Sequence, residues 1–357
     1  HIAEHEVIGV YDYLLSDDPD KYLRDGNTTM HNFDEEVLWD NTNTQRIIKR
    51  QTTGNYIETI QRRKRYDKEK QVYQVEDDRV ILENKEHQVS WHYRNEPSRG
   101  DQMTNIRVDN FREKDYLFTT FEELLDFFFS DIQHRFENNV YLIDRGTENE
   151  EAIIRIKQQD YTLKIVDVVH ADHFVTWYQG HPLWNNYYQY MFDHLADVDL
   201  IVVATKLQRQ AMLSQLKDIG VNNLSRKIVA IPVGGVADVS EPQKWLGGAM
   251  KFVTASRLHS EKHITHIIQA ISQLRQAGLD ATLAIYGAGI EESALITLIN
   301  TLNLSPFVML KGLSQNMRLD MQAYDVFVSA SYSEGFGLTY IEAISNALPI
   351  ATYANLY

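Results

Sequence analysis

The feature that most constrains the fold is a regular alternation of short apolar strands with helices, which begins near residue 140. Apolar strands that alternate with helices are typical of parallel sheets covered on both faces, so we predict an α/β protein. A break after Pro242 divides the alternation into two series and predicts two such domains. The expected strands are 140–143, 164–169, 200–204, 228–231, 252–255, 282–286, 308–310, 326–330 and 349–352. The expected helices are 206–217, 263–277, 291–302, 315–323 and 338–346.

Residues 40–118 have a different pattern, in which Val, Ile, Tyr and Thr alternate with polar residues in short runs. This period of two predicts an antiparallel meander with one solvated face. Residues 120–136 return to helical periodicity, and Thr120 and Glu123 are spaced to form a capping box at its start. The expected strands are 55–60, 71–75, 79–82, 88–93 and 105–108, with turns at 76–78 and 84–86.

Composition and charge exclude several classes of function. The 357 residues include 35 basic and 50 acidic ones, and the net charge of −15 argues against a surface built for nucleic acid. Without cysteine the chain has no disulfide, thiolate nucleophile or cysteine-bound zinc. No apolar run approaches the roughly 20 residues of a membrane helix, and the first residues lack the pattern of a signal peptide. We therefore expect a soluble, cytoplasmic protein with no nucleic-acid partner.

The most informative segment is 331–345, where two glutamates flank a glycine turn. Glu334 follows an expected strand, and Gly335 and Gly337 allow the backbone to approach a ligand closely. A strand, a glycine turn and a helix N-terminus together favour an anion site at the carboxyl end of a parallel sheet. Glu342 lies about one helical turn further, within reach of a sugar or ribose hydroxyl. The plain alternative is a strand–turn–helix with two solvated glutamates.

Two more loops point to the same edge of the sheet. Arg257 and Lys262 follow the strand at 252–255, where they are positioned to grip a diphosphate. Gly287 and Gly289 follow the next strand as a second glycine turn. In open α/β sheets ligands bind at the carboxyl ends of the strands, so these loops predict one shared site.

Together, these motifs resemble the retaining GT-B glycosyltransferases of family 4, in order and spacing, over residues 250–357. Segments 168–173, 182–190 and 231–234 look like the accessory-secretion glycosyltransferases that modify serine-rich repeat adhesins. The resemblance implies a GT-B fold, with two Rossmann-like domains facing a cleft and an inserted antiparallel β-meander. It divides the chain into a remnant of the N-terminal acceptor domain (1–35), the inserted β-rich docking domain (36–118), the continued N-terminal domain (119–245) and a nucleotide-sugar-binding domain (246–357) that is incomplete at its C-terminus.

The resemblance also implies roles for individual residues. Arg257 and Lys262 would neutralise the UDP diphosphate, Glu334 would contact the donor sugar, and His170 would face that sugar. The other residues expected to bind the UDP-sugar are Gly287, Gly289, Leu313, Gly335, Phe336, Gly337, Leu338 and Glu342. Transfer would proceed with retention and without a metal ion or a further cofactor, because the two cations supply the positive charge.

For the whole reaction, the resemblance implies transfer of GlcNAc, or glucose, from a UDP-sugar to Ser or Thr of a serine-rich repeat polypeptide. It implies a homologous partner subunit docked on the β-rich insert, and it is compatible with peripheral association with a membrane. Two alternatives stay open: a wall teichoic acid (polyol-phosphate) glycosyltransferase and a non-catalytic paralogue that binds the acceptor.

Three other patterns each have a plain structural interpretation. Residues 46–70 hold nine basic and three acidic residues, which indicates either a wet face of the meander or a docking surface for a partner or an anionic acceptor. His170, Asp172 and His173 lack a further spaced ligand, so we expect no metal there. An aromatic group at helical spacing favours core packing, and it comprises Trp184, Tyr187, Tyr188 and Tyr190.

Overall fold

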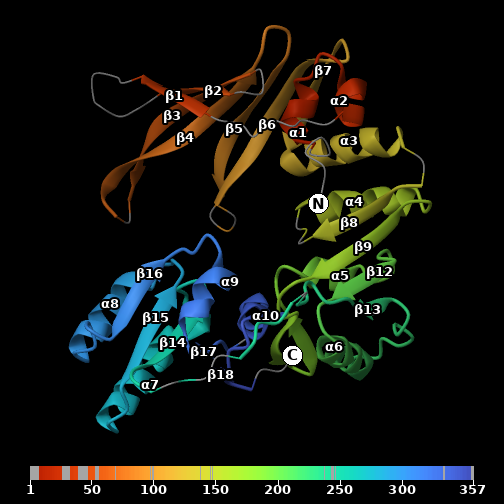
Figure 1. Ribbon diagram of the computed structural model, residues 1–357. Coiled ribbons are helices and arrows are strands. Elements are labelled where there is room, and N and C mark those ends of the chain that lie inside the picture. Colours follow the sequence, from red (N-terminus) through yellow and green to blue (C-terminus); the bar gives the residue numbers. More distant parts are fainter. Residues whose placement is uncertain are drawn as a thin grey trace. The chain divides into compact units, whose positions relative to one another are not determined.

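The computed structural model describes residues 8–25, 33–38, 47–52, 56–68, 70–96, 98, 100–136, 138–144, 146, 148–236, 238–242, 245, 247–332 and 334–354. The chain divides into two compact units, and Figure 1 labels their helices and strands. The first contains residues 1–139 and 148–162, and the second contains residues 140–147 and 163–357. Across these described ranges, no helix combines the length and the apolar composition needed to cross a bilayer.

The first unit is built on a seven-stranded antiparallel sheet whose strands follow one another in chain order, which confirms the predicted meander, although we predicted five strands. Helix α3 (Phe121–Gln133) follows the last strand, and the capping box at its start is confirmed. Thr120 Oγ1 accepts the N–H of Glu123 at 3.4 Å, and the Glu123 carboxylate accepts the N–H of Thr119 at 2.6 Å. The strands are β1 (Phe33–Leu38), β2 (Ile47–Thr52), β3 (Ile57–Asp67), β4 (Val72–Glu83), β5 (Gln88–Glu96), β6 (Gly100–Phe111) and β7 (Lys114–Thr120).

A continuous strand β4 replaces the two strands and the turn that we predicted between residues 71 and 82, so the turn prediction was wrong. Glu76 of β4 accepts a hydrogen bond from Arg65 of β3 at 2.7 Å, and Asp77 lies 2.9 Å from Arg62. Opposite charges facing each other across an antiparallel pair stabilise it. The acidic run therefore stays in the strand because the basic run on β3 neutralises it.

Residues 8–25, which we expected to be a remnant of the Rossmann-like half, pack into the core of the first unit. They form α1 (Val10–Leu14) and α2 (Pro19–Asp25). Tyr13 and Leu14 of α1 are fully buried in one cluster with Phe111 of β6 and Leu124 of α3. The two helices and α3 thus cover one face of the meander.

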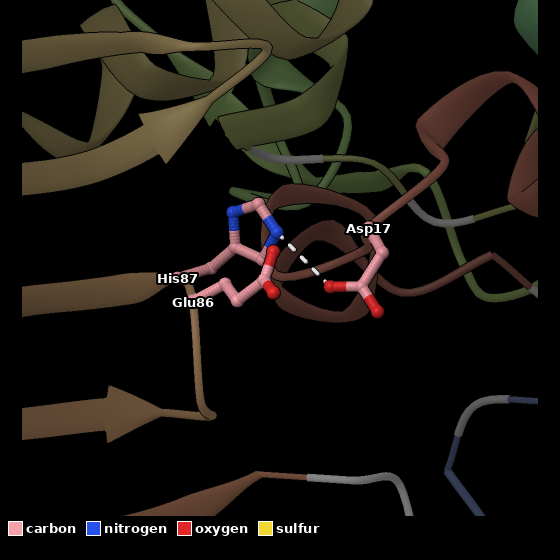
Figure 2. Close-up of side chains that lie close together, drawn as sticks. All are labelled: Asp17, Glu86 and His87. Atoms are coloured by element: carbon pink, nitrogen blue, oxygen red, sulfur yellow. Dashed lines mark hydrogen bonds and ion pairs between the residues drawn. The ribbon is translucent and has the colours of Figure 1, made fainter.

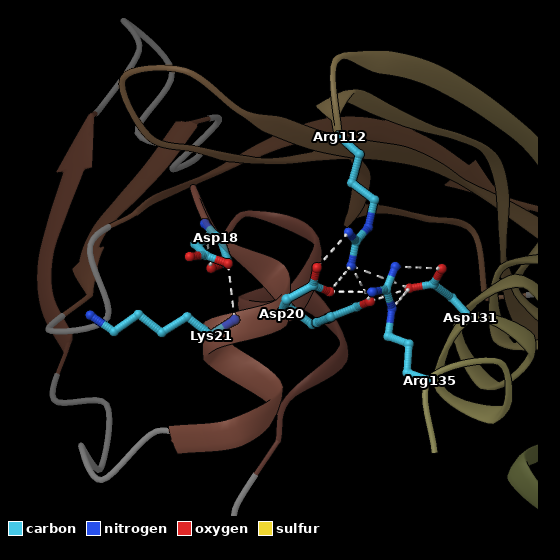
Figure 3. Close-up of polar contacts among 8 residues, drawn as sticks. Asp18, Asp20, Lys21, Arg112, Asp131 and Arg135 are labelled. Atoms are coloured by element: carbon cyan, nitrogen blue, oxygen red, sulfur yellow. Dashed lines mark hydrogen bonds and ion pairs between the residues drawn. The ribbon is translucent and has the colours of Figure 1, made fainter. Parts of the chain in front are cut away.

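A charged network fastens α2 to its neighbours (Figure 3). Arg112, beyond the end of β6, donates to Asp20 of α2 at 2.7 Å, and Asp20 also bonds Arg135. Arg135 in turn lies 3.1 Å from Asp131 of α3. The hydrogen bond from Arg112 lowers the pKa of the Asp20 carboxyl below its usual value. An unpredicted helix, α4 (Glu148–Gln159), packs on α3, where Arg155 bonds Asp126 at 2.8 Å.

The first sheet of the second unit is parallel, with the strand order β13-β12-β9-β8. Its strands β8 (Val140–Asp144), β9 (Lys164–Val169), β12 (Leu200–Val203) and β13 (Ile228–Ala230) agree with the prediction to within a residue. Helix α6 (Lys206–Asp218) begins at Thr205, whose hydroxyl accepts the N–H of Gln208. The sequence pattern missed a hairpin of β10 (Phe174–Tyr178) and β11 (His181–Trp184).

We predicted that the aromatic residues between positions 184 and 190 pack in the core, and this is correct for only part of the group. Trp184 and Tyr188 are buried, whereas Tyr187 is exposed. The spacing misled us because Trp184 belongs to β11 and helix α5 comprises only Gln189–Asp193.

The second sheet is also parallel, with the order β16-β15-β14-β17-β18, and alternate side chains of its strands face two different helix layers. On one face α7 (Ile264–Gln276) and α8 (Glu292–Thr301) cover Leu283 and Ile285. On the other face α10 (Leu338–Ser345) covers Val253 and Phe327. The strands are β14 (Met250–Ala255), β15 (Ala281–Tyr286), β16 (Val308–Gly312), β17 (Val326–Ser329) and β18 (Ile350–Thr352). The short helix α9 (Met317–Asp320) precedes β17.

Candidate functional site

The site lies where the strand order of the second sheet changes direction. From β14 the chain proceeds to β15 and β16 on one side, and then returns to β17 and β18 on the other side of β14. The loops after β14 and β17 therefore diverge, and ligands of open α/β sheets bind in the crevice outside such a switch point. Arg257 and Lys262 follow β14, and Glu334 follows β17, so topology alone brings these side chains to one edge.

A cavity of about 760 Å³ lies at this edge and contains most of the predicted site residues. Arg257, Lys262 and Glu334 line it together with the glycine turn after β17. His170 also lines it, from the carboxyl end of β9. The complete lining is Asp144, His170, Val233, Ala255, Ser256, Arg257, Lys262, Glu334, Gly335, Phe336, Gly337, Leu338 and Thr339. The cavity thus combines two cations and a helix N-terminus, a combination suited to a phosphate-bearing ligand.

Lys262 and Glu334 form an ion pair in the wall of this cavity. The Lys262 Nζ donates to Glu334 Oε1 at 2.6 Å, and the two side chains are only 12% and 21% exposed. Lys262 is the last residue of the short 3-10 helix Ser260–Lys262, which follows the carboxyl end of β14. The pair positions both groups, and it also means that an anionic ligand must compete with Glu334 for the Lys262 ammonium.

Arg257, unlike Lys262, has a side chain that is largely exposed to solvent. Its side chain is 74% exposed, and its guanidinium lies 3.3 Å from Glu261, one turn further along the loop. A weak, solvated pair of this kind contributes little to stability. The guanidinium can therefore turn toward a ligand at small cost.

The glycine turn before α10 requires glycine for two separate reasons. A side chain on Gly335 would place a Cβ 1.9 Å from the carbonyl oxygen of His170, so the β17 loop and the β9 loop touch here through their backbones. Gly337 caps α10 with φ of 73°, a left-handed conformation that glycine adopts without strain. The N-terminus of α10 consequently opens onto the cavity, with the partial positive charge of its unpaired N–H groups.

Four predicted binding residues lie outside the cavity lining. Gly287, with φ of 133°, and Gly289 lie against the backbone of Ser256 and Leu258, so they allow the β15 loop to pack on the β14 loop. Leu313 follows β16 and is 79% exposed. Glu342 is half-buried on α10, and this burial raises the pKa of its carboxyl above the usual value. The structure places these four near the same sheet edge without giving them a contact in the cavity.

His170 is held in place by two neighbours that the sequence pattern did not single out for this purpose. Its Nε2 contacts the Asp144 carboxylate at the end of β8. The Tyr188 hydroxyl accepts the backbone N–H groups of both His170 and Ala171 at 3.0 Å. Because β8 and β9 are neighbouring parallel strands, an acidic residue at the carboxyl end of β8 was the available signal for Asp144.

The other histidine of this loop has no part in the cavity. His173 is fully buried, and its Nε2 bonds the side-chain oxygen of Gln215 at 2.8 Å. Burial lowers the pKa of this imidazole, which keeps the ring neutral. The carboxylate of Asp172 accepts the N–H of Phe174 at 3.1 Å. Among the described residues, His170, Asp172 and His173 form no group that could hold a metal.

Within residues 238–356 the chain matches the family model described as "Glycosyl transferases group 1". The UDP-N-acetylglucosamine--peptide N-acetylglucosaminyltransferase GtfA subunit of Limosilactobacillus reuteri is 36% identical over 215 residues, which is 59% of this chain and 41% of that relative. The chain thus covers less than half the length of this relative. The poly(glycerol-phosphate) alpha-glucosyltransferase of Bacillus subtilis is 36% identical over only 103 residues, 29% of this chain and 15% of that enzyme.

Solved structures agree with the chain over almost its whole length. The pneumococcal O-GlcNAc transferase GtfA in complex with UDP and GlcNAc superposes with a TM-score of 0.64 at 22% identity, over 99% of this chain and 73% of the other. The GtfA/B complex gives a TM-score of 0.65 at 24% identity, over 100% of this chain and 74% of the other. The predicted resemblance and the predicted GT-B fold are therefore confirmed.

Proposed function

We propose that this chain carries the donor site of a UDP-sugar glycosyltransferase that moves GlcNAc, or glucose, to Ser or Thr of a serine-rich repeat polypeptide. The observation that carries the proposal is the cavity at the switch point, where Lys262, Arg257 and the N-terminus of α10 converge. The GtfA relatives, named as UDP-N-acetylglucosamine--peptide N-acetylglucosaminyltransferases, support the choice of GlcNAc and of a polypeptide acceptor.

The residues of the cavity fit the charge that develops during glycosyl transfer. As the bond between sugar and phosphate breaks, negative charge grows on the departing UDP, and preorganised cations stabilise it. Lys262 and Arg257 supply this charge without a metal ion, and the N-terminus of α10 adds its dipole. Glu334 would then accept hydrogen bonds from the sugar hydroxyls. Among the described residues that line the cavity, the carboxylates are Glu334 and Asp144, and Glu334 is held by Lys262, which favours retention through attack on the same face.

Asp144 and His170 would face the sugar from the other wall of the cavity. The Asp144 carboxylate orients the imidazole through Nε2, and Tyr188 fixes the backbone that carries it. We assign His170 to the donor sugar and Asp144 to the positioning of His170. A UDP-sugar is the only small molecule that this proposal requires.

For the acceptor, the charges of the first unit favour a polypeptide over a polyanion. The basic residues of β3 are paired with the acidic run of β4: Arg63 lies 3.0 Å from Glu76 and 3.1 Å from Asp78. Such pairs leave little net positive charge on this part of the sheet for a polyol-phosphate chain. A teichoic acid acceptor is therefore the second candidate, and the match to the Bacillus subtilis enzyme over 103 residues supports it.

We further propose that the first unit docks a homologous subunit, because one of the similar structures is a GtfA/B complex. A cytoplasmic location, peripheral membrane association and transfer without a metal remain predictions. The non-catalytic alternative is disfavoured, since a subunit that only binds the acceptor has no need for the charged residues that line the cavity.

The test is a transfer assay with this protein and a homologous partner subunit, using UDP-GlcNAc and a Ser-rich peptide or a polyol-phosphate polymer. We expect transfer to the peptide, and losses of at least a hundredfold in Lys262→Ala and about tenfold in the more exposed Arg257→Ala. Unchanged activity in both variants would refute the assignment of the site. Exclusive transfer to the polymer would instead select the teichoic acid alternative, and UDP binding without any transfer would select the non-catalytic one.

A further inference from the structure

Two loops of the first unit bring two carboxylates and one imidazole together, far from the cavity in sequence (Figure 2). Asp17 lies between α1 and α2, and Glu86 and His87 lie in the turn between β4 and β5. One ligand atom from each of the three side chains lies within 4.8 Å of the other two. We propose that these residues bind a divalent transition-metal ion, Zn²⁺ by preference, which fastens the α1–α2 loop to the sheet.

The orientation of the His87 ring is the strongest support for this proposal. Only 7% of the His87 side chain is exposed. Its Nδ1 lies 3.0 Å from the backbone carbonyl oxygen of Asn110. A carbonyl can only accept, so Nδ1 carries a proton and donates it to that oxygen. In the neutral ring, Nε2 then carries a lone pair instead of a proton. This nitrogen faces Asp17 Oδ1, which is only 3.1 Å away.

Two acceptor atoms at this distance repel each other unless Nε2 carries a second proton or a metal ion lies between them. A histidine that ligates a metal through Nε2 typically donates its other N–H to a backbone carbonyl, which is the arrangement of His87. The ligand set of one imidazole and two carboxylates suits Zn²⁺. Ligand atoms of a tetrahedral site with bonds of about 2.1 Å lie roughly 3.4 Å apart. The 3.1 Å between His87 and Asp17 is close to that value.

The backbone around the three ligands is held firmly by two asparagines. Asn84 Oδ1 accepts the N–H groups of Glu86 and His87 at 3.0 and 2.8 Å, and its Nδ2 donates to the carbonyl of Leu15 at 2.7 Å. Leu15 is two residues from Asp17, so one side chain positions both loops. Asn110 Nδ2 donates to the carbonyl of Glu86 at 3.0 Å. The turn is thereby ordered before any ion arrives.

The two carboxylates are accessible to an incoming ion. Asp17 is 81% exposed at its side chain, and Glu86 is exposed as well. Within the described residues, the carboxylate of Glu86 takes part in no hydrogen bond or ion pair, so binding a metal breaks no existing contact there. The site holds three protein ligands, and a tetrahedral ion would keep a fourth position for water.

The competing explanation is an ion pair between a doubly protonated His87 and Asp17, with no metal. Isothermal titration of the full 357-residue chain with ZnCl₂ distinguishes the two. We expect one tight site, which weakens at least tenfold in Asp17→Asn and in Glu86→Gln. His92→Gln is the matched control, since His92 is an exposed histidine of the same sheet and should leave the tight site intact.

Thermal unfolding provides the second measurement. Because an ion that binds only the folded state stabilises it, Zn²⁺ should raise the Tm of the wild type and of His92→Gln, but not that of Asp17→Asn. Asp17 is exposed, so we expect Asp17→Asn to keep the fold. Equal Zn²⁺ affinity in the wild type and Asp17→Asn, or an equal loss in His92→Gln, would overturn the proposal and leave only the ion pair.

Discussion

The ion pair between Lys262 and Glu334 leads to a prediction with opposite signs for its two partners. A diphosphate must share the Lys262 ammonium with Glu334, and the carboxylate also repels the incoming anion. Glu334→Gln removes both effects and keeps the shape of the side chain. We therefore expect UDP to bind more tightly to Glu334→Gln, and more weakly to Lys262→Met, than to the wild type.

The magnitude follows from the geometry of the pair. At 2.6 Å and an effective dielectric constant of about 20, the Coulomb energy is roughly 6 kcal/mol. Removing two mostly buried charges from water offsets most of this gain. A net value of about 1–2 kcal/mol remains, in line with hydrogen bonds to charged groups. It corresponds to a change of about 5- to 30-fold in the Kd for UDP.

Calorimetric titration of the variants with UDP measures this change, and a sugar-transfer assay completes the test. We expect Glu334→Gln to gain affinity for UDP while losing transfer, because its sugar contact is weakened. Arg257→Ala is the control. This variant of an exposed arginine should bind UDP more weakly than the wild type, and the addition of Glu334→Gln should not change the size of that loss. If Glu334→Gln loses as much UDP affinity as Lys262→Met, the carboxylate supports nucleotide binding and our reasoning is wrong.

Three further predictions concern the second unit. Gly335→Ala should lower transfer at least tenfold, because its Cβ would lie 1.9 Å from the carbonyl oxygen of His170, whereas Gly235→Ala, which meets nothing within 4 Å, should be near wild type in the same assay. Tyr188→Phe should lower kcat more than the affinity for UDP and cost about 2 kcal/mol in chemical unfolding, because two backbone N–H groups lose their acceptor. Burial raises the pKa of Asp167 to about 7, so the folded state holds its proton up to that pH and the unfolded state only up to about 4. The stability that this group contributes is present below pH 4 and is lost as the pH rises through 7. The total loss is about 4 kcal/mol. The difference in unfolding free energy between the wild type and Asp167→Asn should therefore change by that amount between pH 4 and 8.

Local sequence patterns reliably predicted the features that depend only on residues close together in the sequence. The central strands β14 and β15 are buried on both faces, so their apolar runs could be recognised without knowing their neighbours. The capping box at Thr120 also depends only on residues a few positions apart. The acidic run of β4 was misjudged as a turn because its partner, the basic run of β3, neutralises it only after the strands pair.

The candidate site shows the same division. Glycine turns and charged residues after strands predicted which loops would meet, since carboxyl ends of parallel strands share one edge. Local spacing could not predict the pair of Lys262 and Glu334 or the contact by which Tyr188 holds the His170 loop. It also could not predict that four of the expected binding residues lie outside the lining of this cavity, namely Gly287, Gly289, Leu313 and Glu342. Side-chain contacts between loops depend on how the strands are ordered, and that order is not written in local spacing.

By itself the sequence determined the two kinds of sheet, the loops that carry charge, and the family that the chain resembles. Periodicity and motif spacing encode these properties within a few tens of residues. Only the tertiary structure decided which charges neutralise each other and which remain available to a ligand. The reason is that an ion pair, a buried histidine or a backbone contact needs two segments distant in sequence, and only folding brings them to within a few ångströms.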